Sequence, residues 1–183
     1  MPWRAHSRVV SLYAYDLAEA LNLPEHMKNL ALLAGAVHDI GKRSVPEYIL
    51  TKPGKLTKAE RKLAEQHVIE GENMLVYIAE IVKYHHEKWD GSGYPEKLKG
   101  DEIPLLSQIV SVCDTYAAMI ADRPYRKALT PEVAIAEIKR CSGTQFDPKV
   151  VESFVAMMEK APEEYKEGHG GAFDNVLDKY PTG

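Results

Sequence analysis

Helical periodicity runs through most of this chain and is the feature that most limits its fold. Near the N-terminus, apolar side chains recur at spacings of three and four residues, as at Val9, Leu12 and Tyr13, which places them on one helical face. The segment 87–104 breaks this pattern, since its glycines and prolines favour irregular backbone. We therefore predict an all-α domain, a single compact bundle of about six to seven helices with one long loop.

Capping residues indicate where these helices begin and end. A helix over 25–39 should stop at Gly41, because glycine commonly follows the last helical turn. Thr57 and Glu60 have the spacing of a capping box, so another helix should begin there. The same kind of reasoning predicts further helices over about 69–86 and 105–121, from Pro131, and from Pro148 to about 160.

Length, composition and charge restrict the class of protein. A chain of 183 residues, 45% of them hydrophobic, suits one domain whose core needs no disulfide. We place the folded domain at 1–160 and a glycine-rich tail at 161–183. The net charge of -4 argues against long nucleic acid as a partner. No secretory signal or membrane-spanning apolar run is evident, so we expect a cytoplasmic protein without direct membrane insertion.

Two short blocks of metal-ligand residues stand out within the helical pattern. One is His38-Asp39 and the other is His85-His86, and His67 lies between them. Asp114 follows an apolar run, so this carboxylate should be buried and needs a partner such as a metal. A mixed nitrogen and oxygen set favours Fe, Mn, Co, Ni or Zn over Ca or Mg. The absence of cysteine from the set argues against a structural zinc site.

This donor set suits water activation. An Asp39 carboxylate could bridge two divalent ions lying about 3.5–4 Å apart, an arrangement that lowers the pKa of bound water. Water activated in this way attacks phosphorus near neutral pH. The sequence therefore predicts two divalent transition metal ions, of Fe, Mn, Ni, Co or Zn, and a phosphoester as substrate.

Several blocks in a fixed order carry a family resemblance over about residues 6–155. They are HDIGK at 38–42, KPGKLT at 52–57, His67, HHEKWDGSGYP at 85–95, Asp114, RPYR at 123–126 and QFDP at 145–148. A single His-Asp pair would be a weak signal, whereas this series is specific. The chain resembles an HD-GYP domain, a branch of the HD phosphohydrolase superfamily.

The resemblance implies a function and a set of site residues. HD-GYP domains are metal-dependent phosphodiesterases that hydrolyse cyclic di-GMP, a bacterial second messenger. We expect pGpG as the first product here, and the alternatives of stopping there or cleaving further to GMP stay open. The implied metal ligands are His6, His38, Asp39, His67, His85, His86 and Asp114. Asp39 and Lys42 are the implied catalytic residues, and Lys42 should touch the substrate phosphate or the nucleophile. Arg123 and Arg126 should hold the substrate phosphates, and Tyr94 should line the guanine pocket.

Departures from the family pattern leave alternatives open. Some members hold a third metal through a glutamate four residues before the first histidine, but Pro2 stands there, which favours a dinuclear centre. Ala117 stands where many members have an acidic residue, which puts one substrate contact in doubt. The substrate could instead be cyclic GMP-AMP or another nucleotide, or the domain could be a catalytically weak sensor of cyclic dinucleotides. Arg123 and Arg126 could also be surface ion-pair residues. The resemblance further suggests a GGDEF-domain partner. Independently of it, the oligomeric state is open, with a homodimer through the first or last helices as one alternative.

Overall fold

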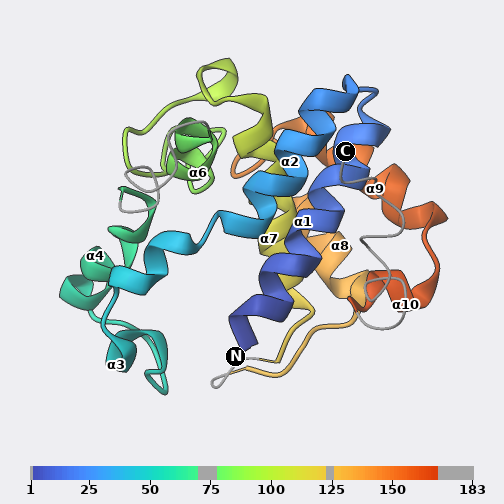
Figure 1. Cartoon of the computed structure of the whole chain (residues 1–183). Helices are drawn as coiled ribbons and strands as arrows, with labels where there is room; N and C mark the ends of the chain where they lie inside the picture. The colour runs from blue at the N-terminus through green and yellow to red at the C-terminus, as the bar shows by residue number, and fades with distance from the viewer. Residues whose placement is uncertain (1, 70–77, 123–125, 169–183) are drawn as a thin grey trace.

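The computed structural model describes residues 2–69, 78–122 and 126–168, and its regular elements in these ranges are all helical (Figure 1). The α-helices are α1 (Pro2–Ala20), α2 (Glu25–Val37), α3 (Glu47–Leu50), α4 (Lys58–Glu65), α6 (Ala79–Tyr84), α7 (Leu105–Met119), α8 (Pro131–Arg140), α9 (Pro148–Lys160) and α10 (Glu163–Lys166), with 3₁₀ turns η1 (Ile40–Ser44) and η2 (Gly100–Glu102). The all-α prediction is confirmed. The number of helices exceeds the prediction partly because α3 and α10 have four residues each, too few to give a periodic signal.

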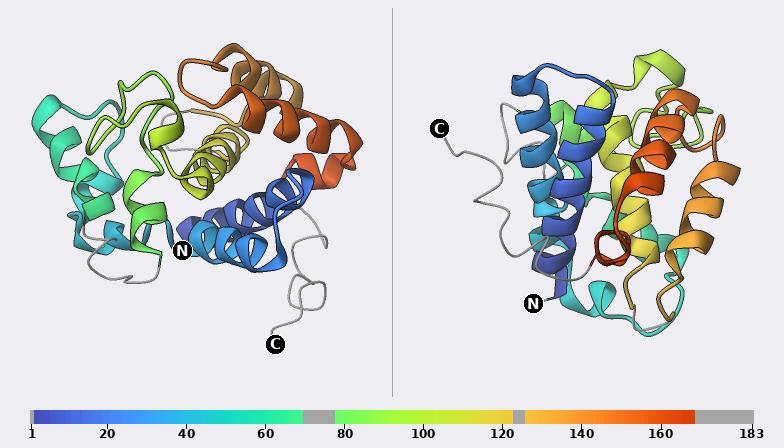
Figure 2. Two further views of the ribbon diagram at one scale, coloured as in Figure 1. Left: turned by 90° about the horizontal axis from the view of Figure 1, so that it is seen from above. Right: turned by 90° about the vertical axis from the view of Figure 1, so that its right-hand side faces the viewer.

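Helix α7 lies at the centre of the bundle. It packs against α1, α2, α6, α8 and α9, and the two turned views show it enclosed by these elements (Figure 2). Most of its length is buried, which fits a sequence that is apolar on almost every side. Tyr13 and Leu17 of α1, Ile109 of α7 and Phe154 of α9 are fully buried in the shared core. This packing fixes α7 against α1 and α2.

A side arm carries the chain away from this bundle. After α2 the chain passes through η1 to α3 and α4, which lie apart from α8, α9 and α10 (Figure 1). Helix α4 has no buried residue. The chain returns toward the bundle at His67, which is buried and begins the next helical segment. The arm therefore separates His67 from the other candidate ligands in sequence but not in space.

Several predicted helix ends are confirmed, and one differs. At the start of α4, Glu60 N donates to Thr57 Oγ1 at 3.3 Å and Thr57 N donates to Glu60 Oε2 at 2.8 Å, which completes the capping box. Helix α2 ends at Val37, two residues earlier than predicted. The chain then tightens into η1. Because of this change, Asp39 lies at the junction of two helical segments.

The loop over 87–104 is held by contacts within it and to the segment before α9. The buried carboxylate of Glu87 accepts a hydrogen bond from Glu96 N at 2.7 Å. Trp89 N donates to Gln145 O at 3.1 Å. A Cβ atom at Gly93 would lie 2.5 Å from Glu87 Cα, so only glycine fits there. The loop is thus an ordered part of the domain.

Helix packing continues past residue 160. Tyr13 Oη donates to Tyr165 O at 2.5 Å, and Tyr116 Oη donates to Lys166 O at 2.8 Å. These bonds dock α10 against α1 and α7. The tail over 169–183 lies outside the described residues, so the predicted domain boundary stays a prediction. Within the described ranges, no helix combines the length and apolar character needed to cross a membrane.

Candidate metal centre

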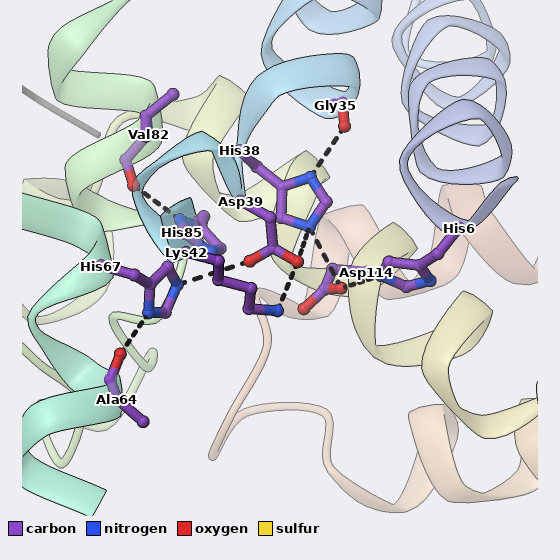
Figure 3. Close-up of polar contacts among 10 residues, drawn as sticks. All are labelled: His6, Gly35, His38, Asp39, Lys42, Ala64, His67, Val82, His85 and Asp114. Atoms are coloured by element: carbon purple, nitrogen blue, oxygen red, sulfur yellow. Dashed lines mark hydrogen bonds and ion pairs between the residues drawn. The ribbon is translucent and has the colours of Figure 1, made fainter. Parts of the chain in front are cut away.

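Seven candidate ligands from five parts of the chain converge beside α7. Figure 3 shows six of them pointing toward one another. They are His6 on α1, His38 and Asp39 after α2, His67 after α4, His85 and His86 after α6, and Asp114 on α7. Their nitrogen and oxygen atoms form two groups, within each of which the atoms lie within 4.8 Å of one another: His67 with His85 and His86, and His6 with His38 and Asp39.

Three of the histidines are oriented by the same local hydrogen bond. The Nδ1 atom of each lies against the carbonyl oxygen three residues earlier, at 2.7 Å for His38, 2.7 Å for His67 and 2.6 Å for His85. If Nδ1 carries the proton and donates, the Nε2 lone pair is left for a metal, as metal-bound histidines usually have it. All three Nε2 atoms are buried and have no hydrogen-bond partner among the described residues. Buried nitrogens without partners are costly, and a metal would satisfy them.

Asp39 joins the two groups of ligands. Its Oδ1 lies 3.5 Å from His67 Nε2, and its Oδ2 lies 3.4 Å from His38 Nε2. Lys42, one turn later on η1, donates from Nζ to the same Oδ2 atom. Each oxygen of this carboxylate therefore faces a different histidine. Such a position suits a ligand shared between two ions.

Asp114 contacts both histidines of the second group, His6 and His38. Its Oδ1 lies 2.8 Å from His6 Nε2 and 3.4 Å from His38 Nε2. The predicted burial of this residue is only partly observed, because 18% of its side-chain surface is exposed. The contact with His6 brings the N-terminal helix into the site. The structure thus places His6 beside the other candidate ligands, although it lies 108 residues from Asp114 in sequence.

Burial and neighbouring charges keep most of these groups in the protonation states that bind metal. Burial lowers the pKa of His67, His85 and His86, and that of His86 falls to about 4. Burial alone would raise the pKa of Asp39, but His38 and Lys42 hold it well below its usual range. Neutral imidazoles and ionised carboxylates are the forms that coordinate a divalent ion.

His38 is the exception among the imidazoles. Burial disfavours its charged form, but the carboxylates of Asp39 and Asp114 outweigh this effect and raise its pKa to about 10. The same two carboxylates would neutralise a metal cation in that place. The donor chemistry, the unpartnered nitrogens and the two carboxylates together fit divalent transition metal ions.

Of the residues predicted to contact substrate, Tyr94 lies beside the metal centre, whereas Arg126 contacts the end of α7. Tyr94 packs its ring against His86, with ring centroids 5.1 Å apart, which places it at the edge of the first group. Arg126 donates from Nη2 to Ala118 O at 2.8 Å and Met119 O at 3.1 Å. It therefore caps the end of α7, and its contact with phosphate stays a prediction. Arg123 lies outside the described residues.

Two features of the site were not predicted from sequence. Glu87 has only 2% of its surface exposed and anchors the 87–104 loop beside His86. The signal available in the sequence was an acidic residue directly after His85 and His86, in a block that was interpreted only for its histidines. Ala117 has 2% exposure and packs in the hydrophobic core, so its methyl group faces the bundle.

Comparisons with known proteins agree with this geometry. The family model described as HD domain matches residues 3–150. A cyclic di-GMP phosphodiesterase of Pseudomonas aeruginosa is 41% identical over 157 residues, covering 82% of this chain and 38% of that protein. A cyclic di-GMP phosphodiesterase of Thermotoga maritima is 37% identical over 174 residues, covering 91% and 47%.

Other similar proteins are named for a different substrate, cyclic GMP-AMP. A 3'3'-cGAMP-specific phosphodiesterase of Vibrio cholerae is 37% identical over 174 residues, covering 87% of this chain and 33% of that protein. A crystal structure of a Vibrio cholerae cyclic GMP-AMP specific phosphodiesterase superposes with a TM-score of 0.73 at 19% identity, covering 96% and 49%. The last match supports the fold alone. This chain spans less than half the length of each of these proteins.

Proposed function

This chain belongs to the HD domain family, and we propose that it is a metal-dependent phosphodiesterase that hydrolyses cyclic di-GMP. The observation that carries the proposal is the set of three buried Nε2 atoms, of His38, His67 and His85, that have no hydrogen-bond partner among the described residues. Two of them, those of His38 and His67, face the carboxylate of Asp39. An enzyme of this kind needs such nitrogens free for metal. Names of relatives at 37–41% identity support cyclic di-GMP as the substrate.

The proposed ligands divide between two ions. His67, His85 and His86 would hold one and His6, His38 and Asp114 the other, with Asp39 shared between them. Bound divalent ions would supply activated water and neutralise the charge on the phosphate. Iron or manganese is the proposed metal, with nickel, cobalt or zinc as alternatives.

Other side chains would bind and orient the substrate. Tyr94 offers an aromatic face beside His86 on which a guanine base can stack. Lys42 and the arginines at 123 and 126 would offset phosphate charge that grows in the transition state. The product would be pGpG, with GMP formed by a second cleavage. A GGDEF-domain partner, a homodimer and a cytoplasmic location remain predictions.

Cyclic GMP-AMP is the second candidate substrate. The Vibrio cholerae relative named for it is 37% identical to this chain, the same figure as the Thermotoga maritima cyclic di-GMP phosphodiesterase. The two dinucleotides differ in one base and share their phosphodiester bonds. The choice between them therefore depends on contacts to one base rather than on the metal centre.

Turnover by protein reconstituted anaerobically with Mn²⁺ or Fe²⁺ tests the proposal. Cyclic di-GMP and cyclic GMP-AMP are supplied separately, and the products are resolved by chromatography alongside metal analysis. We expect metal-dependent formation of pGpG from cyclic di-GMP. Faster hydrolysis of cyclic GMP-AMP would instead support the second candidate, and two bound metals without hydrolysis of either would support the sensor alternative.

Matched histidine variants test the site assignment. His85→Ala should lose bound metal and at least about a hundredfold in turnover, because one imidazole ligand is removed. His26 is exposed on the surface of α2, so His26→Ala should retain both. Full activity in a His85→Ala protein that holds no metal would contradict a metal-dependent mechanism.

A further inference from the structure

Lys42 forms an ion pair with Asp39, the carboxylate that the two proposed metal ions would share. Its Nζ donates to Asp39 Oδ2, and its backbone N–H donates to Asp39 O at 2.9 Å. The Asp39 side chain is 7% exposed, whereas that of Lys42 is 38% exposed. The lysine thus reaches a buried acceptor from the rim of the site. Figure 3 shows Lys42 among the candidate ligands, with its ammonium beside the Asp39 carboxylate.

The two oxygens of Asp39 leave little room for both a lysine and two metals. Oδ1 faces His67 Nε2 at 3.5 Å, and Oδ2 faces His38 Nε2 at 3.4 Å. Ligation through both oxygens would place a divalent cation on the atom that Lys42 now contacts. An ammonium and a divalent cation repel each other at such close range in a partly buried site. Lysine is a point charge on a flexible stem, so it can move outward while the buried carboxylate stays in place.

We propose that metal binding displaces Lys42 from Asp39 and makes its ammonium available to the substrate phosphate. The second step, in which the Lys42 ammonium contacts the substrate phosphate, rests on the proposed function. In this scheme Lys42 is held by Asp39 until metal is bound. One lysine therefore links metal occupancy to the affinity for an anionic substrate.

The exchange predicts effects of opposite sign on metal and substrate. Removing the ammonium removes a competitor for Asp39, so metal should bind more tightly. It also removes a cation for the phosphate, so substrate should bind less tightly when metal is present. By thermodynamic linkage, the factor by which metal strengthens substrate binding equals the factor by which substrate strengthens metal binding. Both factors should therefore be smaller, by the same proportion, in a protein without the Lys42 ammonium.

The first measurement is the affinity for Mn²⁺ alone, by calorimetry on chelator-treated protein. We expect Lys42→Met to bind Mn²⁺ roughly five- to tenfold more tightly than the wild type, which is the lower end of the usual range for coupling between two bound groups. The matched control is Lys52→Met. Lys52 makes a similar ion pair, with Nζ 2.6 Å from Glu60 Oε2 and 30% of its side chain exposed, but on the arm away from Asp39.

The second measurement repeats the series with a non-hydrolysable phosphorothioate analogue of cyclic di-GMP, with and without Mn²⁺. In the wild type, Mn²⁺ should strengthen binding of the analogue, and in Lys42→Met this strengthening should be about tenfold smaller. Lys52→Met should match the wild type in both measurements. Weaker Mn²⁺ binding by Lys42→Met would overturn the proposal, because it would mean that the lysine only holds Asp39 in position.

The two proposals fail separately. Tighter Mn²⁺ binding by Lys42→Met, with neither dinucleotide hydrolysed by the wild type, would support the exchange at Asp39 and overturn the proposed function. Unchanged Mn²⁺ affinity in Lys42→Met, with cyclic di-GMP hydrolysed normally by the wild type, would overturn the exchange and leave the function standing.

Discussion

Gly35 allows α1 and α2 to approach closely, and its replacement tests how this contact supports the metal centre. A Cβ atom at Gly35 would lie 2.7 Å from Ser11 Cα, whereas ordinary contact begins at 3.4 Å, so the helices must separate by about 0.7 Å. Alanine in a helix is worth about 1 kcal/mol over glycine, and overpacking costs about 1–3 kcal/mol. We expect Gly35→Ala to lower the free energy of unfolding by about 1 kcal/mol and Tm by roughly 2–4 °C.

The same separation should weaken metal binding. His6 lies on α1 and His38 follows α2, and their ring centroids are 5.7 Å apart. Gly35 also supplies the carbonyl that contacts His38 Nδ1. Ligands displaced by a sizeable fraction of an ångström lose much of their productive geometry. Calorimetry should therefore show Mn²⁺ affinity reduced about tenfold in Gly35→Ala, alongside urea unfolding for stability.

Ala36→Gly is the matched control for this prediction. Ala36 is exposed on the same helix, so glycine there should cost about 1 kcal/mol through helix propensity alone. Its Mn²⁺ affinity should equal that of the wild type. The reasoning is refuted if Gly35→Ala proves more stable than the wild type and binds Mn²⁺ unchanged, since propensity would then be the whole effect.

Three further predictions follow from other contacts. Tyr116→Phe removes the hydroxyl that donates to Lys166 O at 2.8 Å, so urea titration should show a loss of about 1 kcal/mol with Mn²⁺ affinity unchanged. Hydrogen bonds from Lys52 and, to a smaller extent, from Thr57 lower the pKa of Glu60 to about 2. The stability from this carboxylate is therefore present above its unfolded pKa of about 4.3 and lost as pH falls toward 2. An NMR titration should show this midpoint near 2, and Lys52→Met should raise it. Chelation should lower the Tm of the reconstituted wild type but not that of His85→Ala.

Local sequence signals predicted much of the secondary structure. The capping box at Thr57 and the Asp147-Pro148 start of α9 are observed, because these devices involve residues only two or three positions apart. The end of α2 was predicted two residues too late. There the chain tightens into η1 instead of stopping at Gly41.

The sequence indicated the candidate metal ligands more fully than the contacts of Arg126. The histidine and aspartate blocks indicated which side chains could form a ligand set, since metal-ligand residues have few other reasons to be adjacent on buried helical segments. The structure brings these side chains together, and their role as ligands stays a prediction. Arg126 was assigned to substrate phosphate, and its Nη2 contacts two carbonyls at the end of α7. Such a contact depends on how the chain after α7 folds back, which no local pattern encodes.

The sequence by itself determined that the chain is helical, that it resembles HD-GYP domains, and which imidazoles and carboxylates are available for metal. Only the tertiary structure decided that His6 meets Asp114 across the bundle, that three imidazoles are oriented by the backbone carbonyls three residues before them, and that Lys42 contacts Asp39. The physical reason is the range of the forces involved. Periodicity and capping act within a few residues, whereas the burial of α7 between α1, α2 and α9 brings distant segments to the same place.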